Sequence, residues 1–439
     1  MIGSEGFRRY FTNTSWLFLE RVVRLLVVLG TGIVVARYLG PGLFGKLNYA
    51  TGFVGIFFAL TTMGLDEIVV RELVRDPARR NALLGTSVVI RMAGALLLIG
   101  IVAVSAWGRQ LDGLTALLVL IIAASEVLKP FTVVDWHFMA QVRSRPTVLV
   151  QMAQVFISAF AKIALVYWQA PLIWFAWVYV LENAAMSVGY LIAYRTDGNR
   201  LRDWRYDRRE AAFLLNESWP LVIFGMALYV QAKIDQVMLG DMLRPILGEE
   251  ASDAEVGQYS NALKMIEAMG FLPVIVQKSL APAITRAKAQ GRAQYEDRLI
   301  NQYRLMFLMF LVTAVPLYLV AEPLMVLLFG EEFRPSGVLL SLFAIRLFFT
   351  NMGVGKSSFI TNESLFRYSL ITGVVGAGSN ILLNYFLIPP FKSVGAIWAT
   401  IGSFTISIFL MDLLMKETRA NFKWMFIAIG SFWKIGKAR

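Results

Sequence analysis

Charged side chains interrupt the long apolar stretches of this sequence at positions where lipid would surround them. Arg21 and Arg24 lie in the apolar segment from Trp16 to Ala36, three residues apart and therefore on one face of a helix. About twenty residues are enough to cross the hydrocarbon core of a bilayer as a helix. A guanidinium at that depth is unfavourable by at least about 2.5 kcal/mol, so we expect both side chains to face water or an anion.

Two more arginines, Arg91 and Arg346, lie near the middle of later apolar stretches, too deep to reach the surface easily. A guanidinium matches the geometry of phosphate, and two or three of them could hold a diphosphate. The predicted diphosphate ligands are therefore Arg21, Arg24, Arg91 and Arg346. Further cations are expected to line the same cavity, namely Lys162, Lys233, Lys264 and Arg304.

Carboxylates in similar positions could couple transport to an ion, because burial raises the pKa of a carboxyl group toward neutrality. The candidates are Glu182, Asp235 and Glu267. Lys264 and Glu267 are three residues apart and could instead neutralise each other. The coupling ion is either H⁺ or Na⁺ at this stage, and no other cofactor is expected.

The elements that must position these residues are membrane-spanning helices. Of the 439 residues, 57% are hydrophobic and 16% charged, a balance typical of a multi-pass membrane protein. Apolar runs of about twenty residues predict an all-α fold with about twelve transmembrane helices. Their approximate centres are Leu26, Ile56, Gly94, Leu120, Phe156, Glu182, Met226, Met269, Val312, Arg346, Gly378 and Phe404.

The net charge of +12 is explained by membrane topology and does not call for a nucleic-acid partner. Loops on the side of the N-terminus carry most of the Lys and Arg residues, above all the loop from Tyr194 to Arg209. Loops on the opposite side carry only Arg37, Lys46, Arg109, Arg244, Arg334 and Lys392. This asymmetry predicts that both termini are cytoplasmic and that the number of spans is even.

The basic loop near the middle of the chain divides six predicted helices from six. We predict an N-terminal six-helix bundle (1–195), a basic cytoplasmic linker (196–212), a C-terminal six-helix bundle (213–416) and a basic amphipathic cytoplasmic tail (417–439). Within that tail, Phe422 to Trp433 is too short to span and is expected to lie at the interface. The similar segments FGKLNYA (44–50) and VGQYSNA (256–262) indicate a parallel internal repeat.

Motifs of enzymes are weak in this sequence. The run from Gly353 to Ser358 resembles the end of a phosphate-binding loop, but Thr350 stands where that motif has glycine and an apolar helix precedes it. A membrane glycan polymerase usually has a large extracytoplasmic loop, whereas the longest outer loop here, Gly240 to Gly257, is short. We therefore expect a transporter and no catalytic residues.

A family resemblance accompanies these features. The stretch NTSWLFLERVVRLL…VARYLGPGLFGKLNYA, with TTMGLDEIVVRELVR and VLKPFTVVDWHFMAQVRSR, resembles the Wzx-type polysaccharide flippases of the MOP transporter superfamily. The resemblance implies two six-helix bundles arranged as a V in the bacterial inner membrane. It implies ion-driven export of undecaprenyl-diphosphate-linked oligosaccharides, such as O-antigen repeat units, by alternating access.

The same resemblance implies membrane lipid and other glycan assembly proteins as partners. By position on corresponding helices, it matches the family's cavity cations to Arg21, Arg24 and Arg91. The alternatives are another exporter of the superfamily, for multidrug or lipid II transport, and less favourably a glycan polymerase. A drug exporter should carry few central cations because its substrates are commonly cationic.

Overall fold

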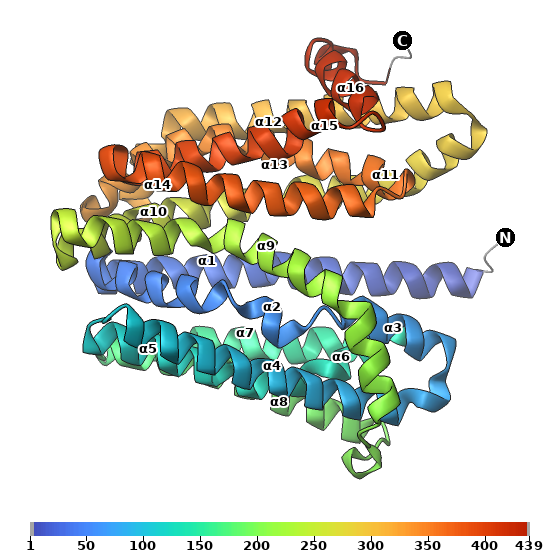
Figure 1. Cartoon of the computed structure of the whole chain (residues 1–439), viewed down its shortest axis with the longest axis horizontal. Coiled ribbons are helices and arrows are strands. Elements are labelled where there is room, and N and C mark those ends of the chain that lie inside the picture. Colours follow the sequence, from blue (N-terminus) through green and yellow to red (C-terminus); the bar gives the residue numbers. More distant parts are fainter. Residues whose placement is uncertain (1–3, 437–439) are drawn as a thin grey trace. The chain divides into compact units, whose positions relative to one another are not determined.

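The computed structural model describes the backbone of residues 4–436 and the side chains from residue 19 onward. The described residues form helices and no strands, and they pack as two compact units. Unit 1 contains the chain up to Leu39 together with Tyr49–Lys233, and unit 2 contains Gly40–Asn48 and the chain from Ile234 onward. Helices lie lengthwise beside one another within each unit (Figure 1).

The helices up to the middle of the chain run mainly through unit 1. They are α1 (Ser4–Gly55), α2 (Phe58–Thr62), α3 (Asp66–Arg75), η1 (Pro77–Arg79), α4 (Arg80–Gly108), α5 (Gly113–Ser125), η2 (Glu126–Val133), α6 (Val134–Ala140), α7 (Ser144–Tyr167), α8 (Leu172–Thr196), η3 (Leu201–Asp203) and α9 (Arg208–Leu247). Short turns join α4 to α5 and α7 to α8, as expected for antiparallel neighbours.

The remaining helices belong to unit 2. They are α10 (Glu249–Met269), α11 (Phe271–Gln290), α12 (Arg292–Phe329), η4 (Glu331–Phe333), α13 (Arg334–Asn362), α14 (Phe366–Phe404), the π-helical turn η5 (Thr405–Leu410), α15 (Met411–Leu414), α16 (Arg419–Ile429) and η6 (Phe432–Lys434). The segment that resembled a phosphate-binding loop lies inside α13, so it forms no loop that could cradle a phosphate.

Ten helical segments of the described chain are long and apolar enough to cross a membrane. Two of them contain non-helical residues at which the chain direction changes, Gly40 in the first and Lys392 in the last. Pro41 follows Gly40 directly, and the positive φ of 66° at Gly40 suits a residue without a side chain. If both segments are divided at these residues, the count agrees with the predicted twelve helices.

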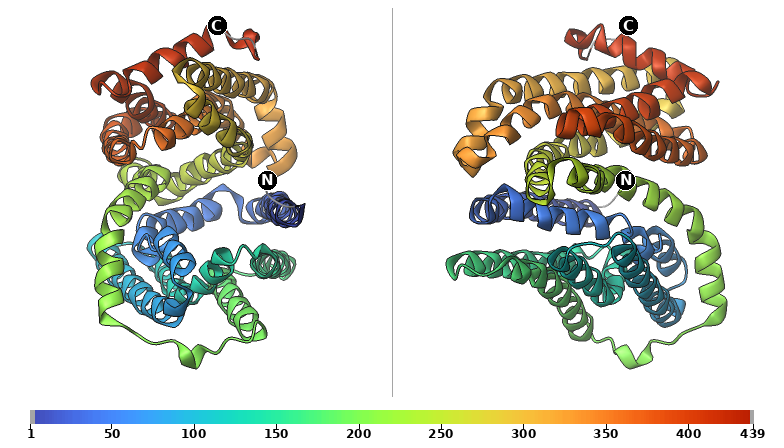
Figure 2. Two further views of the ribbon diagram at one scale, coloured as in Figure 1. Left: turned by 90° about the vertical axis from the view of Figure 1, so that its right-hand side faces the viewer. Right: turned by 60° about the vertical axis from the view of Figure 1, so that its left-hand side comes forward.

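The border between the units lies within α9, at Lys233 and Ile234, whereas the sequence placed the linker at 196–212. That predicted linker joins α8 to α9 and carries the short helix η3 (Figure 2). The amide of Arg205 donates to the carbonyl of Asn81, and Gly85 has no room for a side chain beside the Arg205 backbone. The linker is therefore packed onto α4 within unit 1.

The two copies of the predicted repeat meet through their glycines in unit 2. A methyl group on Gly45 would lie 1.7 Å from the carbonyl oxygen of Asp253, and one on Gly257 would lie 2.0 Å from that of Pro41. Small residues allow helix backbones to approach this closely. Lys46 extends the contact with an ion pair to Glu249, whose closest atoms are 2.6 Å apart. Equivalent glycines thus form one close helix crossing.

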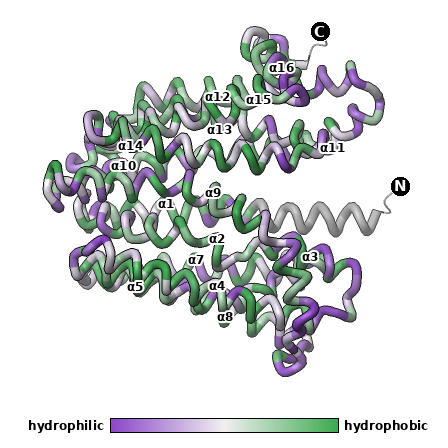
Figure 3. The backbone as a smooth tube through the Cα atoms, in the orientation of Figure 1, coloured by the Kyte–Doolittle hydropathy of each residue, from purple (hydrophilic) through white to green (hydrophobic). Residues whose placement is uncertain are grey.

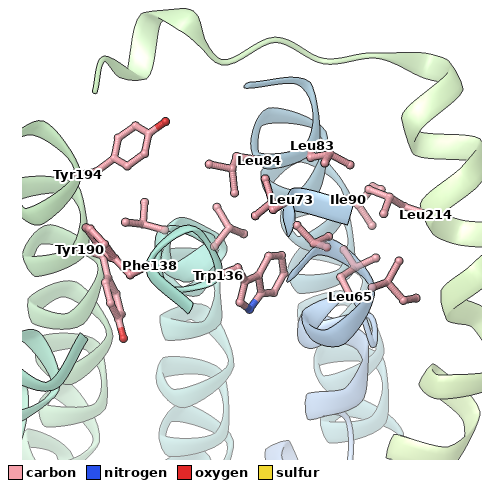
Figure 4. Close-up of a cluster of buried hydrophobic side chains, with 14 of the residues drawn as sticks. Leu65, Leu73, Leu83, Leu84, Ile90, Trp136, Phe138, Tyr190, Tyr194 and Leu214 are labelled. Carbon is pink, nitrogen blue, oxygen red and sulfur yellow. The ribbon is translucent and has the colours of Figure 1, made fainter. Parts of the chain in front are cut away.

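Unit 1 has a buried apolar cluster where α3, α4, α6 and the end of α8 meet (Figure 4). Leu65, Leu83, Trp136, Phe138 and Tyr194 are among its members, and each is at most 5% exposed. Hydrophilic residues concentrate near this end of unit 1, around α3 and in the linker, while hydrophobic residues follow the long helices (Figure 3). The cluster therefore fixes the helix ends where water adjoins the unit.

Candidate functional site

Unit 1 buries the guanidinium of Arg91, on α4, beside two breaks in neighbouring helices. The Arg91 side chain is 5% exposed. Its Nε donates to the carbonyl of Thr61 (3.0 Å), and its Nη1 donates to Oγ1 of Thr132 (2.9 Å). The guanidinium also lies 5.3 Å from the centre of the Trp136 ring, within the range of a cation–π interaction.

The two residues whose oxygens accept hydrogen bonds from Arg91 lie in irregular helical segments. Helix α2 ends at Thr62, where Met63 adopts the left-handed conformation, so the Thr61 carbonyl is among the last four that lack a helical partner. A cation at a helix C-terminus is also favoured by the helix dipole. Thr132 lies in η2, an eight-residue 3₁₀ stretch with Pro130 inside it. Such long 3₁₀ stretches are uncommon and mark strain or a hinge.

A buried carboxylate completes this polar cluster. Glu126, 1% exposed, accepts from Oγ1 of Thr61 (3.1 Å) and pairs with Lys129 at 2.6 Å. The Lys129 ammonium lies 4.3 Å from the centre of the Phe58 ring. We call Arg91, Thr61, Glu126, Lys129 and Thr132 the Arg91 cluster. None of its side-chain polar atoms is buried without a hydrogen-bond partner in the described structure.

The two arginines of α1 have different surroundings. Arg21 is exposed, and no partner is seen for it among the described residues. Arg24 is half-buried; it pairs with Glu20 one turn earlier, and its Nη2 donates to Oε1 of Gln151 on α7 (3.1 Å). The Gln151 amide in turn donates to the hydroxyl of Tyr190 (3.2 Å). Arg24 is thus held from α7 and α8 while part of its guanidinium stays accessible.

The other predicted charges of unit 1 lie apart from the Arg91 cluster. Lys162 and Glu182 form an ion pair between α7 and α8 at 2.8 Å, and Ser158 donates to the same carboxylate. Lys233 is half-buried on α9 with its aliphatic stem against Gly55. Lys162 and Glu182 therefore neutralise each other across the adjacent helices α7 and α8.

Unit 2 buries the carboxylate of Asp235, on α9, among donors from two other helices. Asp235 is 5% exposed. One oxygen accepts from the Tyr259 hydroxyl (2.5 Å) and from Oγ1 of Thr400 (2.7 Å), and the other accepts from Nδ2 of Asn384 (2.6 Å). The three donors are each at most 3% exposed.

Two asparagines on α14 leave polar atoms unused beside this carboxylate. Asn384 keeps its Oδ1 without a partner, and Asn380, one turn earlier on the same helix face, has neither its Oδ1 nor its Nδ2 bonded. Both residues are fully buried. Unpartnered amide groups in such a place are costly, so a function or a bound species is the usual explanation. We call Asp235, Tyr259, Asn380, Asn384 and Thr400 the Asp235 cluster.

The oxygen atoms of the Asp235 cluster are suitable ligands for a hard cation. One carboxylate with neutral amide and hydroxyl oxygens resembles the ligand set that alkali and alkaline-earth ions prefer. The described residues contain no group of three or more His, Cys, Asp or Glu side chains placed to hold a metal ion, so they offer no transition-metal site. A monovalent cation bound there would neutralise the charge of the Asp235 carboxylate.

Arg346, on α13, has an unused donor in unit 2. Its Nε is buried without a hydrogen-bond partner, and the guanidinium lies 5.9 and 5.6 Å from the ring centres of Phe343 and Phe404. The Phe343 ring in turn packs against that of Tyr259, the donor to Asp235, with the ring centres 5.2 Å apart. Arg346 and the Asp235 cluster are therefore neighbours within one unit, which the sequence alone did not predict.

The remaining predicted residues of unit 2 are placed elsewhere. Lys264 is exposed, with its ammonium 4.4 Å from the centre of the Phe44 ring, and Glu267 is exposed one turn later. Arg304 is 4% exposed and binds the end of the chain: Nε donates to Oγ of Ser431 (3.0 Å) and Nη1 to the carbonyl of Lys434 (3.1 Å). In the described structure, Arg304 thus anchors the C-terminal segment.

The sequence prediction missed several residues of these clusters. Asn380 and Asn384 are four apart in an apolar helix, a signal that a search for polar pairs on one helix face could have found. A second buried pair was also missed: Lys356 and Asp412 lie 2.7 Å apart, with Nζ of Lys356 also donating to the Ile408 carbonyl in the π-helical turn. No sequence pattern links those two residues.

Comparisons with known proteins agree with this architecture. A model of the family described as "Polysaccharide biosynthesis protein" matches residues 11–287, well over half of the chain. No protein among curated sequences matches significantly.

Solved structures share the fold over nearly the whole chain. The lipid II flippase MurJ, in an inward closed conformation, has a TM-score of 0.70 at 11% identity, covering 96% of this chain and 92% of that one. A multidrug resistance MATE transporter of the MOP superfamily, inward-facing, has a TM-score of 0.62 at 14% identity, covering 94% and 96%. A MATE transporter of Vibrio cholerae has a TM-score of 0.60 at 14% identity, covering 95% and 100%.

These likenesses establish a multi-pass membrane protein with the helical fold of MATE and MurJ transporters. The structures compared are described as transporters and a flippase. The chain belongs to the family described as "Polysaccharide biosynthesis protein".

Proposed function

We propose that this protein moves undecaprenyl-diphosphate-linked oligosaccharides from the cytoplasmic to the periplasmic leaflet of a bacterial inner membrane, as a Wzx-type flippase does. Transport would proceed by alternating access, and both termini would be cytoplasmic. The family match supports a glycan-related substrate, and the similarity to a lipid II flippase supports a substrate with a lipid diphosphate.

The observation that carries this proposal is the supply of arginines with unused donors inside predicted spans. Arg346 has a buried Nε without a partner, Arg21 is exposed, and Arg24 is only partly committed to Glu20 and Gln151. Free guanidinium donors in a membrane protein are best explained by an anionic ligand. Arg91 uses Nε and Nη1 on Thr61 and Thr132, so we assign it a structural role within unit 1.

The Asp235 cluster is the proposed ion-coupling site, and its geometry favours Na⁺ over H⁺. A proton needs only the carboxylate, which already accepts three hydrogen bonds. A sodium ion needs several oxygens, and the unpartnered Oδ1 atoms of Asn380 and Asn384 are such oxygens. Glu182, paired with Lys162, and exposed Glu267 are weaker candidates for this role.

A multidrug exporter is the second candidate function, since the MATE structures share the fold. Arginines with unused N–H donors argue against this second function, because their positive charge would repel a cationic drug.

The test is a flipping assay with the full chain in vesicles and a fluorescent lipid-diphosphate oligosaccharide. We expect transport that depends on a Na⁺ gradient, and at least about a tenfold loss of that dependence in Asp235→Asn, because the substitution removes the negative charge of the cluster. Glu250→Gln, an exposed acid of α10, is the matched control and should behave as wild type.

Three results would contradict parts of the proposal. Movement of a cationic drug without movement of the lipid diphosphate would favour the exporter. Dependence on a proton gradient alone would reject Na⁺. A loss in Glu182→Gln or Glu267→Gln equal to that in Asp235→Asn would remove Asp235 as the coupling residue.

A further inference from the structure

A cavity in unit 2 lies beside the C-terminal helix α16, and none of the residues that line it belongs to the Asp235 cluster. Its volume is about 510 Å³. Lys288, Arg292, Glu363, Lys416 and Glu417 supply charged side chains to its wall, and Tyr295, Phe359 and Trp424 supply aromatic ones. Cavities of this size accommodate small ligands.

The charges of this cavity lie at the ends of candidate membrane spans. Lys288 is two residues before the end of one candidate span at Gln290, and Arg292 begins the next. Glu363 follows a third span that ends at Asn362, and Lys416 follows a fourth that ends at Leu414. Four candidate spans therefore end around the cavity, and the layer of lipid headgroups is expected near such helix ends.

Some of the charged groups are already neutralised within the protein. Lys288 pairs with Glu363 at 3.0 Å, and Arg292 pairs with Glu296 at 3.0 Å. Lys416 and Glu417, both exposed in the turn before α16, have no ion-pair partner among the described residues. The cavity thus offers one free cation and one free anion side by side.

An unsatisfied hydroxyl points to a ligand as well. Tyr295 is 4% exposed, and its hydroxyl lies close to the Glu363 carboxylate without a well-formed hydrogen bond. Tyr295 packs against Trp424, with the two ring centres 6.3 Å apart. A buried hydroxyl without a well-formed hydrogen bond is unfavourable, and a ligand oxygen would relieve this.

We propose that this cavity binds a zwitterionic phospholipid whose headgroup carries a primary ammonium, that is, phosphoethanolamine. The phosphate interacts with Lys416 and the Tyr295 hydroxyl, and the ammonium donates hydrogen bonds to Glu417. Phe359 and Trp424 contact the apolar part of the lipid. An anionic lipid fits less well because Glu417 would repel it, and a choline headgroup fits less well because it has no N–H to donate.

The experiment uses the full chain in detergent, with lipids of identical acyl chains added in turn. Retention of each lipid is measured by native mass spectrometry, and thermal stability is measured in parallel. We expect phosphatidylethanolamine to bind about fivefold more tightly than phosphatidylcholine or phosphatidylglycerol, the advantage of one partly exposed charge-assisted hydrogen bond.

Two variants and one control separate the contributions. Glu417→Gln should reduce the preference over phosphatidylcholine to about one and improve phosphatidylglycerol binding, because the repulsive charge is gone. Lys416→Ala should weaken the binding of all three lipids. Lys423→Ala, an exposed cation on α16 outside the cavity, should change nothing.

Several outcomes would overturn the proposal. Equal binding of the three lipids by the wild type is one, and an unchanged lipid preference in Glu417→Gln is another. Competition by millimolar free phosphoethanolamine, as effective as the lipid itself, would show that the site takes a soluble ligand. None of these outcomes depends on which substrate the protein transports.

Discussion

Unit 1 buries a cation, Arg91, whereas unit 2 buries an anion, Asp235, and the two are held by different kinds of partner. Arg91 donates to a backbone carbonyl at a helix break and to a threonine hydroxyl, so its charge compensates for irregular backbone. Asp235 accepts from three side chains, and amide atoms beside it remain unused. A satisfied cluster indicates a structural role, and an unsatisfied one indicates a ligand.

The largest effect is expected from Arg91→Met. Methionine fills similar space but leaves the Thr61 carbonyl without its donor and the break in α2 without its cation. We expect the free energy of unfolding to fall by about 3 kcal/mol. Arg91→Lys should recover part of it, because an ammonium can still reach one of the two oxygens. Thermal unfolding of the purified protein measures both.

The same variant tests directly whether the Arg91 cluster has a structural role and the Asp235 cluster a ligand-binding one. If Arg91→Met keeps wild-type stability but loses transport of the lipid diphosphate, Arg91 binds substrate and the Arg91 cluster is a functional site. A loss of stability with normal transport per folded molecule would support the structural role.

A smaller effect on stability is expected from Asn380→Ala, because the Asn380 amide forms no hydrogen bond that the substitution could remove. The free energy of unfolding should change by less than about 1 kcal/mol, whereas Na⁺ affinity should fall about tenfold. Asn384→Ala is the matched variant. It removes the bond to Asp235 and should reduce both stability and Na⁺ affinity.

The measurement is the rise in unfolding temperature as Na⁺ is added, with K⁺ as the reference salt. If Asn380→Ala keeps the full Na⁺ response, the unused amide is not a ligand. If the wild type itself shows no Na⁺ response, the Asp235 cluster is not a sodium site, and the difference between the two units loses its functional meaning.

Much of the fold could be predicted from the sequence because membrane-spanning helices leave a local signal. Apolar runs predicted about twelve helices, a number that agrees with the ten candidate spans once those with kinks at Gly40 and Lys392 are divided. The border of the units inside α9 was not predictable, since a helix that continues from one packed unit into another shows no change of composition there.

The site could be predicted only in part. Asp235 was identifiable as a carboxylate in an apolar stretch, but Asn384 and Thr400 follow it by more than a hundred residues and meet it only through tertiary packing. Arg304 shows the opposite case: the pattern favours a cavity cation, yet the segment after α16 folds back and uses its donors. Whether a charged group is free depends on such distant contacts.

The smallest effect is expected at the solvent end of unit 1, where Asp197 provides a reference for both buried clusters. Its carboxylate pairs with Arg143 at 2.6 Å and lies 3.5 Å from Nε2 of His137. Burial opposes ionisation of Asp197, but the hydrogen bond and charge of Arg143, with a smaller effect of His137, hold its pKa below the ordinary value.

Because the pKa of Asp197 is lower in the folded protein than in the unfolded chain, the pair stabilises the protein above the ordinary pKa of about 3.9. This stabilisation is lost as the pH falls through the lower, folded-state pKa. Arg143 is well exposed, so we expect less than about 1 kcal/mol. Unfolding temperatures from pH 7 to pH 3 should therefore fall slightly more steeply for the wild type than for Asp197→Asn. A difference as large as that of Arg91→Met would mean that burial does not govern these charges, which would remove the physical basis for contrasting the two clusters.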